Sequence, residues 1–283
     1  MAEYERSPTP DDMRRLLDSG NERAFPGMIG SLDCMHWEWK NFPTELQGAY
    51  SRGSGNPTIM LEAVASRDLW IWHSFFGMAG SNNDINVLHR GHLFNDAQRG
   101  RDLAVDYVVN GRHYNRSYYL VDDIYPTWSR FVKSIRHPHT RKERLFAREQ
   151  ESARKDIERA FGVLQARWQI LSRPARIFDR ETLADMMHCC IILHNMIVEE
   201  ERDRYEAGDN DLYYEPPPEI PNLTPPQRWH QGGPLPYHLE MEVRINILND
   251  ATHRQLKDDL MEHIWRFRGA RFMEEEDGNE SSD

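Results

Sequence analysis

The sequence has few of the features that mark secreted or membrane proteins. Three cysteines in 283 residues are too few for a disulfide framework at this length. The longest apolar stretches, such as residues 189–193, fall far short of the about 20 apolar residues that cross a bilayer. The N-terminus lacks the charged-then-apolar pattern of a secretory signal. We therefore expect a soluble protein with no membrane partner, in a reducing compartment, the nucleus or the cytoplasm.

The chain also lacks an overall positive charge, which nucleic-acid-binding proteins commonly carry. Its formal net charge is −11. Residues 130–180 depart from this balance, because they contain fourteen Lys or Arg against six Asp or Glu. A local basic surface can contact phosphates, although a solvated charged helix would give the same composition. The charge distribution therefore permits DNA as a partner without requiring it.

The length of the chain and its 39% hydrophobic content predict one main domain with appendages. No internal repeat divides it further. Composition predicts five segments: a polar lead-in over residues 1–25, the main domain over 26–205, a proline-rich linker over 206–238, an amphipathic helix over 239–272, and an acidic disordered tail over 273–283.

The apolar patterns of the main domain predict a mixed α/β fold. Short runs rich in β-branched and aromatic residues predict strands over residues 28–39, 58–65, 69–77, 118–121 and 131–135. We expect the first three to pair as antiparallel hairpins. Apolar residues at helical spacing predict helices over residues 10–17, 83–98, 141–171 and 181–203.

Three widely separated acidic residues have contexts that suit a metal site. Asp33 lies in the first predicted strand, Asp122 follows the apolar run 118–121, and Glu158 lies on a predicted helix. Glu158 is about 100° round that helix from Ile157, so it flanks the apolar stripe without entering it. Carboxylates from two strands and a helix can hold a pair of divalent cations that act on phosphodiesters. Each acid alone is better explained by a turn or a solvated helix, and only their joint placement points to a nuclease.

Other residues invite a functional interpretation more weakly. His188, Cys189, Cys190 and His194 include the residue types that bind zinc, but they scatter around a helix instead of converging. Packing is the favoured explanation for them. His36 could hydrogen-bond near the proposed metals or pack among its aromatic neighbours, and both interpretations stay open.

Four motifs, in order, resemble plant transposases of the PIF/Harbinger family. They are the stretches around Asp33 (residues 30–41), Asp84 (80–88), Asp122 (118–126) and Glu158 (151–164). The resemblance extends into residues 190–198. It implies a ribonuclease-H-like fold, in which a mixed sheet is flanked by helices, with a C-terminal helical extension.

The resemblance implies a DDE-type endonuclease or transposase that cleaves DNA and leaves 3′-hydroxyl ends. Its catalytic residues would be Asp33, Asp122 and Glu158, which would bind Mg²⁺ or Mn²⁺. Asp84 would be a further metal ligand, or alternatively a helix cap. In position 123 an Asp replaces the Gly that related sequences tend to have, which leaves two adjacent carboxylates.

Three basic residues near Glu158, namely Arg154, Lys155 and Arg159, would hold the phosphate backbone. The resemblance further implies transposon ends as the DNA partner, a Myb-like DNA-binding partner protein, a homo-oligomer when active, and nuclear localisation. We expect the N-terminal DNA-binding region of longer relatives to be absent. The alternatives are a domesticated, catalytically silent chromatin or protein-interaction module, and a decaying transposon remnant.

Overall fold

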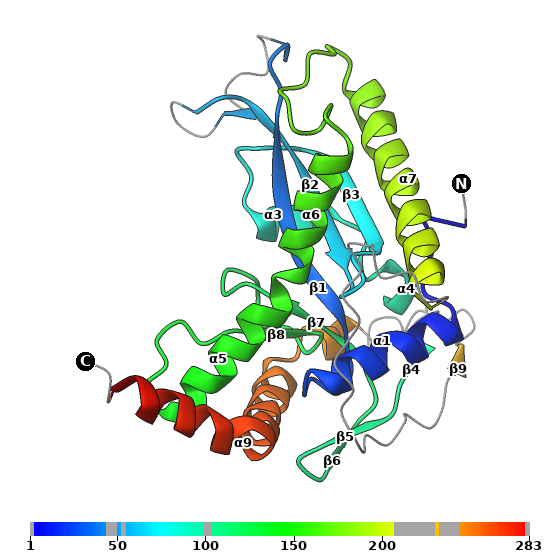
Figure 1. Cartoon of the computed structure of the whole chain (residues 1–283). Coiled ribbons are helices and arrows are strands. Elements are labelled where there is room, and N and C mark those ends of the chain that lie inside the picture. Colours follow the sequence, from blue (N-terminus) through cyan, green and yellow to red (C-terminus); the bar gives the residue numbers. More distant parts are fainter. Residues whose placement is uncertain are drawn as a thin grey trace. The chain divides into compact units, whose positions relative to one another are not determined.

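The structure is a computed structural model that describes residues 3–43, 50–51, 55–98, 103–206, 230–231 and 244–280. The chain divides into two compact units (Figure 1). Unit 1 comprises Met1–Pro8, Ser31–Leu93 and Lys155–Pro216; unit 2 comprises Thr9–Gly30, Phe94–Arg154 and Pro217–Asp283. The five segments predicted from composition stay a prediction, and most of the proposed linker lies outside the described residues.

A mixed five-stranded sheet has the strand order β3-β2-β1-β7-β8. Its strands are β1 (Met28–Glu38), β2 (Thr58–Ala65), β3 (Ile71–Ala79), β7 (Tyr118–Val121) and β8 (Phe131–Lys133). β1 pairs with β2, and β2 with β3, in the antiparallel sense, whereas β7 and β8 are parallel. The predicted strands are thereby confirmed with small shifts at their ends. A sheet of this order with flanking helices is a ribonuclease-H-like α/β fold.

Unit 1 contains β2, β3 and most of β1, together with the helices α3 (Asp84–Arg90), α6 (Asp156–Arg167) and α7 (Arg180–Glu206). On one face, α6 packs on β2 and α7 on β3 (Figure 1). The core between them includes Met35, Leu61, Ala63, Ile157, Leu164, Met187 and Ile191. On the other face, Val87 of α3 is clustered with Met60 and Met78. The apolar stripes predicted for α6 and α7 are buried in this core.

Unit 2 contains β7 and β8 together with the helices α1 (Pro10–Glu22), α4 (Asn95–Gln98), α5 (Arg141–Arg154) and α9 (Asp250–Glu280). Two short ribbons complete it: β4 (Leu103–Ala104) with β9 (His230–Gln231), and β5 (Tyr107–Val109) with β6 (Arg112–Tyr114). α9 packs on α5, β5 and β8. Asp259 of α9 accepts hydrogen bonds from the Tyr114 hydroxyl at 2.5 Å and the Arg112 guanidinium at 2.7 Å.

Two predicted helices are interrupted in the structure. The helix expected over residues 141–171 is two helices, because Lys155 separates α5 from α6. The helix expected over residues 83–98 ends at Gly91, whose ψ of 169° is extended. A Cβ atom at Gly91 would lie 2.8 Å from Glu62 Oε1, so a larger residue at this point would require the Glu62 side chain to shift.

The C-terminal helix differs in its bounds from the prediction. α9 begins at Asp250, because the Asn249 side chain accepts a hydrogen bond from the Thr252 amide at 3.1 Å and caps it. It continues to Glu280, over most of the tail expected to be disordered. Among the described helices, none combines the length and the apolarity that crossing a membrane requires.

Candidate active site

Asp33 lies on the face of the sheet that α6 covers. In the antiparallel pairing of β1 with β2 it stands opposite Ala63, which is fully buried in the same cluster as Ile157 of α6. Met35, two residues along β1, belongs to that cluster as well. Because side chains alternate along a strand, Asp33 points to this face. Asp33 is half-buried, and its Oδ1 accepts a hydrogen bond from the Cys34 amide at 2.8 Å.

Glu158 lies in the first turn of α6 and is exposed. It is adjacent to Ile157, which is fully buried against the sheet. Asp33 therefore lies on the sheet face that is covered by α6, the helix that carries Glu158. The convergence of their two carboxylates stays a prediction. Two acidic residues in this first turn also suit the positive end of the helix dipole.

Asp122 directly follows β7, in unit 2, and is exposed. Its Oδ1 accepts a hydrogen bond from the Asp123 amide at 2.7 Å, and it makes no ion pair with any described residue. Asp123 instead forms ion pairs: its Oδ2 lies 3.3 Å from Arg136 Nε, and its Oδ1 lies 3.8 Å from Lys133 Nζ. Of the two adjacent carboxylates, Asp122 is thus the one left available to a cation. Since it belongs to a different unit from Asp33, the convergence of the predicted triad stays a prediction.

Gln150 of α5 holds the end of β7 and was not among the residues predicted from the sequence. It is fully buried, and its Nε2 donates to the carbonyl oxygens of Val121 at 3.0 Å and Val132 at 3.1 Å. Val121 immediately precedes Asp122, so Gln150 fixes the backbone from which that carboxylate extends. The sequence did contain a signal for this role. Gln150 is a polar residue one helical turn after Phe146, on the apolar side of the predicted helix.

Glu62 is a second polar residue that was not predicted. It is fully buried in β2, with Oε1 3.2 Å from His73 Nε2, and its Oε2 has no hydrogen-bond partner among the described residues. It stands opposite Cys34, and therefore occupies the other face of the sheet from Asp33. His36 lies on this face as well. The sequence contained a signal for it, because Glu62 is a charged residue within an otherwise apolar predicted strand, and a buried charge needs a partner.

Asp84 is the first residue of α3, but Asn83 provides the cap. The Asn83 side chain accepts a hydrogen bond from the Asn86 amide at 2.8 Å. α3 packs on β2 through Val87, on the face opposite to Asp33. The metal role of Asp84 stays a prediction.

The three predicted DNA contacts lie where α5 meets α6 in the sequence. Arg154 is the half-buried last residue of α5, and Lys155 is exposed between the helices. Arg159 is exposed, with its guanidinium 3.4 Å from the buried Asp156. Lys155 and Arg159 therefore place positive charge on both sides of Glu158 along α6. Their contact with DNA is still a prediction.

Of the residues that superficially suggested zinc, His194 and Cys190 are buried, whereas Cys189 is exposed and His188 is half-buried. His194 is fully buried, with Nε2 2.8 Å from the Leu69 carbonyl oxygen and Nδ1 3.2 Å from Arg167. Burial, together with the Arg167 charge, lowers the pKa of His194 to about 4, so the ring is neutral at pH 7. Across the described residues, no group of three or more His, Cys, Asp or Glu side chains is arranged to hold a metal ion.

Comparison with known proteins matches most of the chain to one family. The model of a family described as "Plant transposon protein" matches residues 2–205. "Protein ALP1-like" from Arabidopsis thaliana is 24% identical over 182 residues, which are 63% of this chain and 45% of that relative. The chain thus covers less than half of the length of this curated relative. No solved structure matches the chain.

Proposed function

We propose a function on one premise: the chain belongs to the plant transposon protein family, as the resemblance of its motifs predicted. This is a family of transposase-derived DDE nucleases, which typically use divalent metals. We propose that the chain is a metal-dependent DNA endonuclease, the catalytic part of a transposase, that leaves 3′-hydroxyl ends. The observation that carries the proposal is that Asp33 lies on the face of the sheet covered by α6, whose first turn carries Glu158.

The chemistry of the three acidic side chains fits divalent cations. Mg²⁺ and Mn²⁺ bind carboxylate oxygens and keep several waters, so they suit sites that are open to solvent. Asp122 and Glu158 are exposed and Asp33 is half-buried. In the proposed site Asp33 would contribute to both cations, Asp122 to one and Glu158 to the other. When bound, the cations would activate the attacking water and stabilise the leaving 3′ oxygen.

The basic residues beside Glu158 would position the DNA. Lys155 and Arg159 would bind backbone phosphates, as would Arg154, and such contacts hold DNA without reading its sequence. The substrate would then be transposon ends, selected with the help of a Myb-like DNA-binding partner. We also propose a nuclear protein that acts as a homo-oligomer, since transposition joins paired ends.

A second candidate function is a domesticated, catalytically silent chromatin or protein-interaction module. The observation that favours it is the curated relative, whose name, Protein ALP1-like, states no enzymatic activity. The overall acidic charge of −11 also gives no general attraction to DNA.

Incubation of the purified full chain with supercoiled plasmid and with a duplex that carries terminal repeats distinguishes the two candidates. The nuclease is expected to nick DNA only when Mg²⁺ or Mn²⁺ is added, and DNA polymerase should extend the nick from a free 3′-hydroxyl. Well-folded protein that leaves both substrates intact under all metal conditions would favour the silent module.

A further inference from the structure

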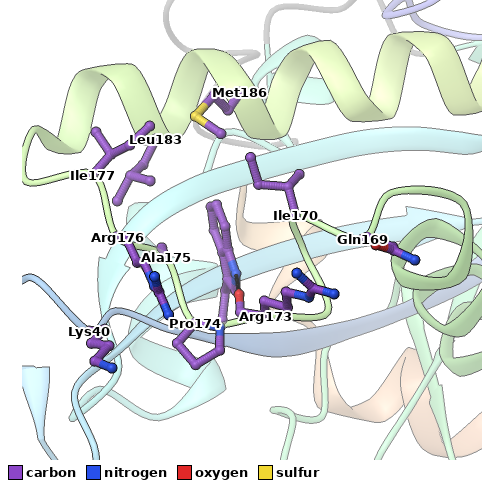
Figure 2. Close-up of a pocket in the computed structure, with 11 residues that line it drawn as sticks. Lys40, Gln169, Ile170, Arg173, Pro174, Ala175, Arg176, Ile177, Leu183 and Met186 are labelled. Atoms are coloured by element: carbon purple, nitrogen blue, oxygen red, sulfur yellow. Dashed lines mark hydrogen bonds between the residues drawn. The ribbon is translucent and has the colours of Figure 1, made fainter.

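A groove with apolar walls lies in unit 1, between the end of β1, the start of α7 and the segment that joins α6 to α7 (Figure 2). It encloses about 560 Å³, which is in the size range of ligand-binding pockets. Trp37, Ile170, Leu183 and Met186 are among its apolar lining residues. We call it the Trp37 groove.

The Trp37 groove is preformed, because hydrogen bonds attach the joining segment to β1. The Trp37 indole N–H donates to the Arg173 carbonyl oxygen at 2.8 Å, and that of Trp39 donates to the Ile177 carbonyl oxygen at 2.7 Å. The backbone of Ala175 makes two further hydrogen bonds of 2.8 Å with residues of the β1 end. Ligand binding would therefore cost little conformational entropy for ordering this wall of the groove.

The rim of the groove is positively charged. Lys40, Arg173 and Arg176 are exposed lining residues, and no acidic side chain of the described residues lines the groove. None of these three cations makes an ion pair within the part of the chain that the structure describes. The lining residue Ile170 exposes 47% of its surface, and Phe178, which follows the lining residue Ile177 in the sequence, exposes 64%. A ligand for this site must combine negative charge with apolar groups.

We propose that the Trp37 groove binds an acidic segment of a partner protein, with an aliphatic or aromatic side chain against Ile170 and Met186 and carboxylates on Arg173 and Arg176. A DNA duplex would supply phosphates for the cations but no side chain to fill the apolar cavity. An acidic peptide with apolar anchors supplies both. Trp37 lies four residues along β1 from Asp33, or about 13 Å, so this site goes beyond the proposed nuclease function and does not depend on it.

Fluorescence anisotropy of a short labelled peptide tests the proposal on the full chain. The probe alternates Asp and Glu with Leu and Phe; one control peptide replaces Leu and Phe with Ser, and the other replaces the acids with Lys. Saturable binding is expected for the probe alone. No saturable binding of the probe, or equal binding of the Ser peptide, would overturn the proposal.

Variants then locate the binding site. The charge reversal Arg173→Glu/Arg176→Glu should weaken probe binding at least about 10-fold. Ile170→Ser should weaken it about 10-fold, because the apolar surface that Ile170 exposes to the ligand is lost. The matched control Arg14→Glu/Arg254→Glu makes the same charge change at exposed arginines of unit 2 and should leave binding unchanged. Equal loss in the control would overturn the assignment.

Two other occupants give different results. If the groove served DNA, Arg173→Glu/Arg176→Glu would weaken binding of a labelled duplex, and excess duplex would displace the probe. If it served a second copy of the chain, light scattering would show a dimer that this variant dissociates. Either result would overturn the assignment to an acidic peptide. Circular dichroism of each variant confirms that it is folded.

Discussion

Asp33 stands directly opposite Ala63 in the pairing of β1 with β2, and Ala63 lies in the core beneath α6. This register decides which face of the sheet receives the Asp33 carboxylate. A shift by one residue would turn Asp33 to the other face, away from Glu158. The pairing therefore connects the fold to the proposed chemistry.

Asp33→Asn and Glu158→Gln should each reduce metal-dependent nicking by at least about 100-fold, since changes even to groups that support metal ligands cost about 10- to 100-fold. Neither side chain is fully buried, so both variants should unfold in urea close to the wild-type midpoint. Glu181→Gln is the matched control, because Glu181 is also exposed in the first turn of a helix. A comparable loss of nicking in Glu181→Gln would show that the effect is not specific to the proposed site.

Gln150→Leu should impair the reaction through the position of Asp122. The substitution leaves the carbonyl oxygens of Val121 and Val132 without their shared donor, at a cost of about 1 to 3 kcal/mol in unfolding free energy. The Mn²⁺ concentration for half-maximal nicking should also rise, measured at a temperature where the variant is folded. If stability falls but the Mn²⁺ dependence is unchanged, Gln150 is structural only.

His194 should make the fold sensitive to acid. Burial lowers its pKa to about 4 in the folded chain, whereas the unfolded chain takes up this proton near pH 6.5. The unfolded state therefore binds more protons between these values, so stability falls as the pH drops from about 6.5 toward about 4, by about 2 kcal/mol at pH 5.

Urea unfolding at about pH 7.5 and about pH 5 measures this loss, which should be smaller in His194→Gln. Burial also lowers the pKa values of His253 and His263, but these residues are present in both proteins, so the difference between them reports His194. Equal losses on acidification would show that His194 does not control the acid response.

Substitutions of the buried pair Glu62 and His73 should have strongly non-additive effects on the free energy of unfolding. His73→Ala removes the partner at 3.2 Å and leaves a buried carboxylate, which should cost about 3 kcal/mol or more in unfolding free energy. Adding Glu62→Leu removes the charge from an environment that includes Met60 and Met78, and should restore most of that loss. Simple additivity of the two single substitutions in urea unfolding would rule out the coupling.

Much of the fold could be predicted from the sequence, because strand and helix periodicities are local. The β5–β6 hairpin was missed although its signal was present: Asn110 and Gly111 have φ values of 51° and 79°, and Asn-Gly is the preferred turn for such a hairpin. The break at Lys155 was not predictable in the same way, since the apolar spacing continues across it and no Pro or Gly marks it.

The candidate site was predictable in part. Asp33, Asp122 and Glu158 could be found from strand ends, helix position and family motifs. The choice of Asp122 over Asp123 came from the family motif. The ion pairs of Asp123 with Arg136 and Lys133 could not be predicted, because such tertiary contacts leave no periodic trace in the sequence. Gln150 and Glu62 act through buried hydrogen bonds, and their partners are likewise set by three-dimensional packing.

In the proposed function, Asp122 belongs to a metal-dependent nuclease site. This assignment is tested most directly by the initial rate of supercoiled-plasmid nicking in Mn²⁺ for wild type, Asp122→Asn and Asp123→Asn, with equal amounts of folded protein. We predict that Asp122→Asn loses at least about 100-fold of the rate, whereas Asp123→Asn, which changes a carboxylate already paired with Arg136, retains most of it. Equal rates for wild type and Asp122→Asn would contradict the account.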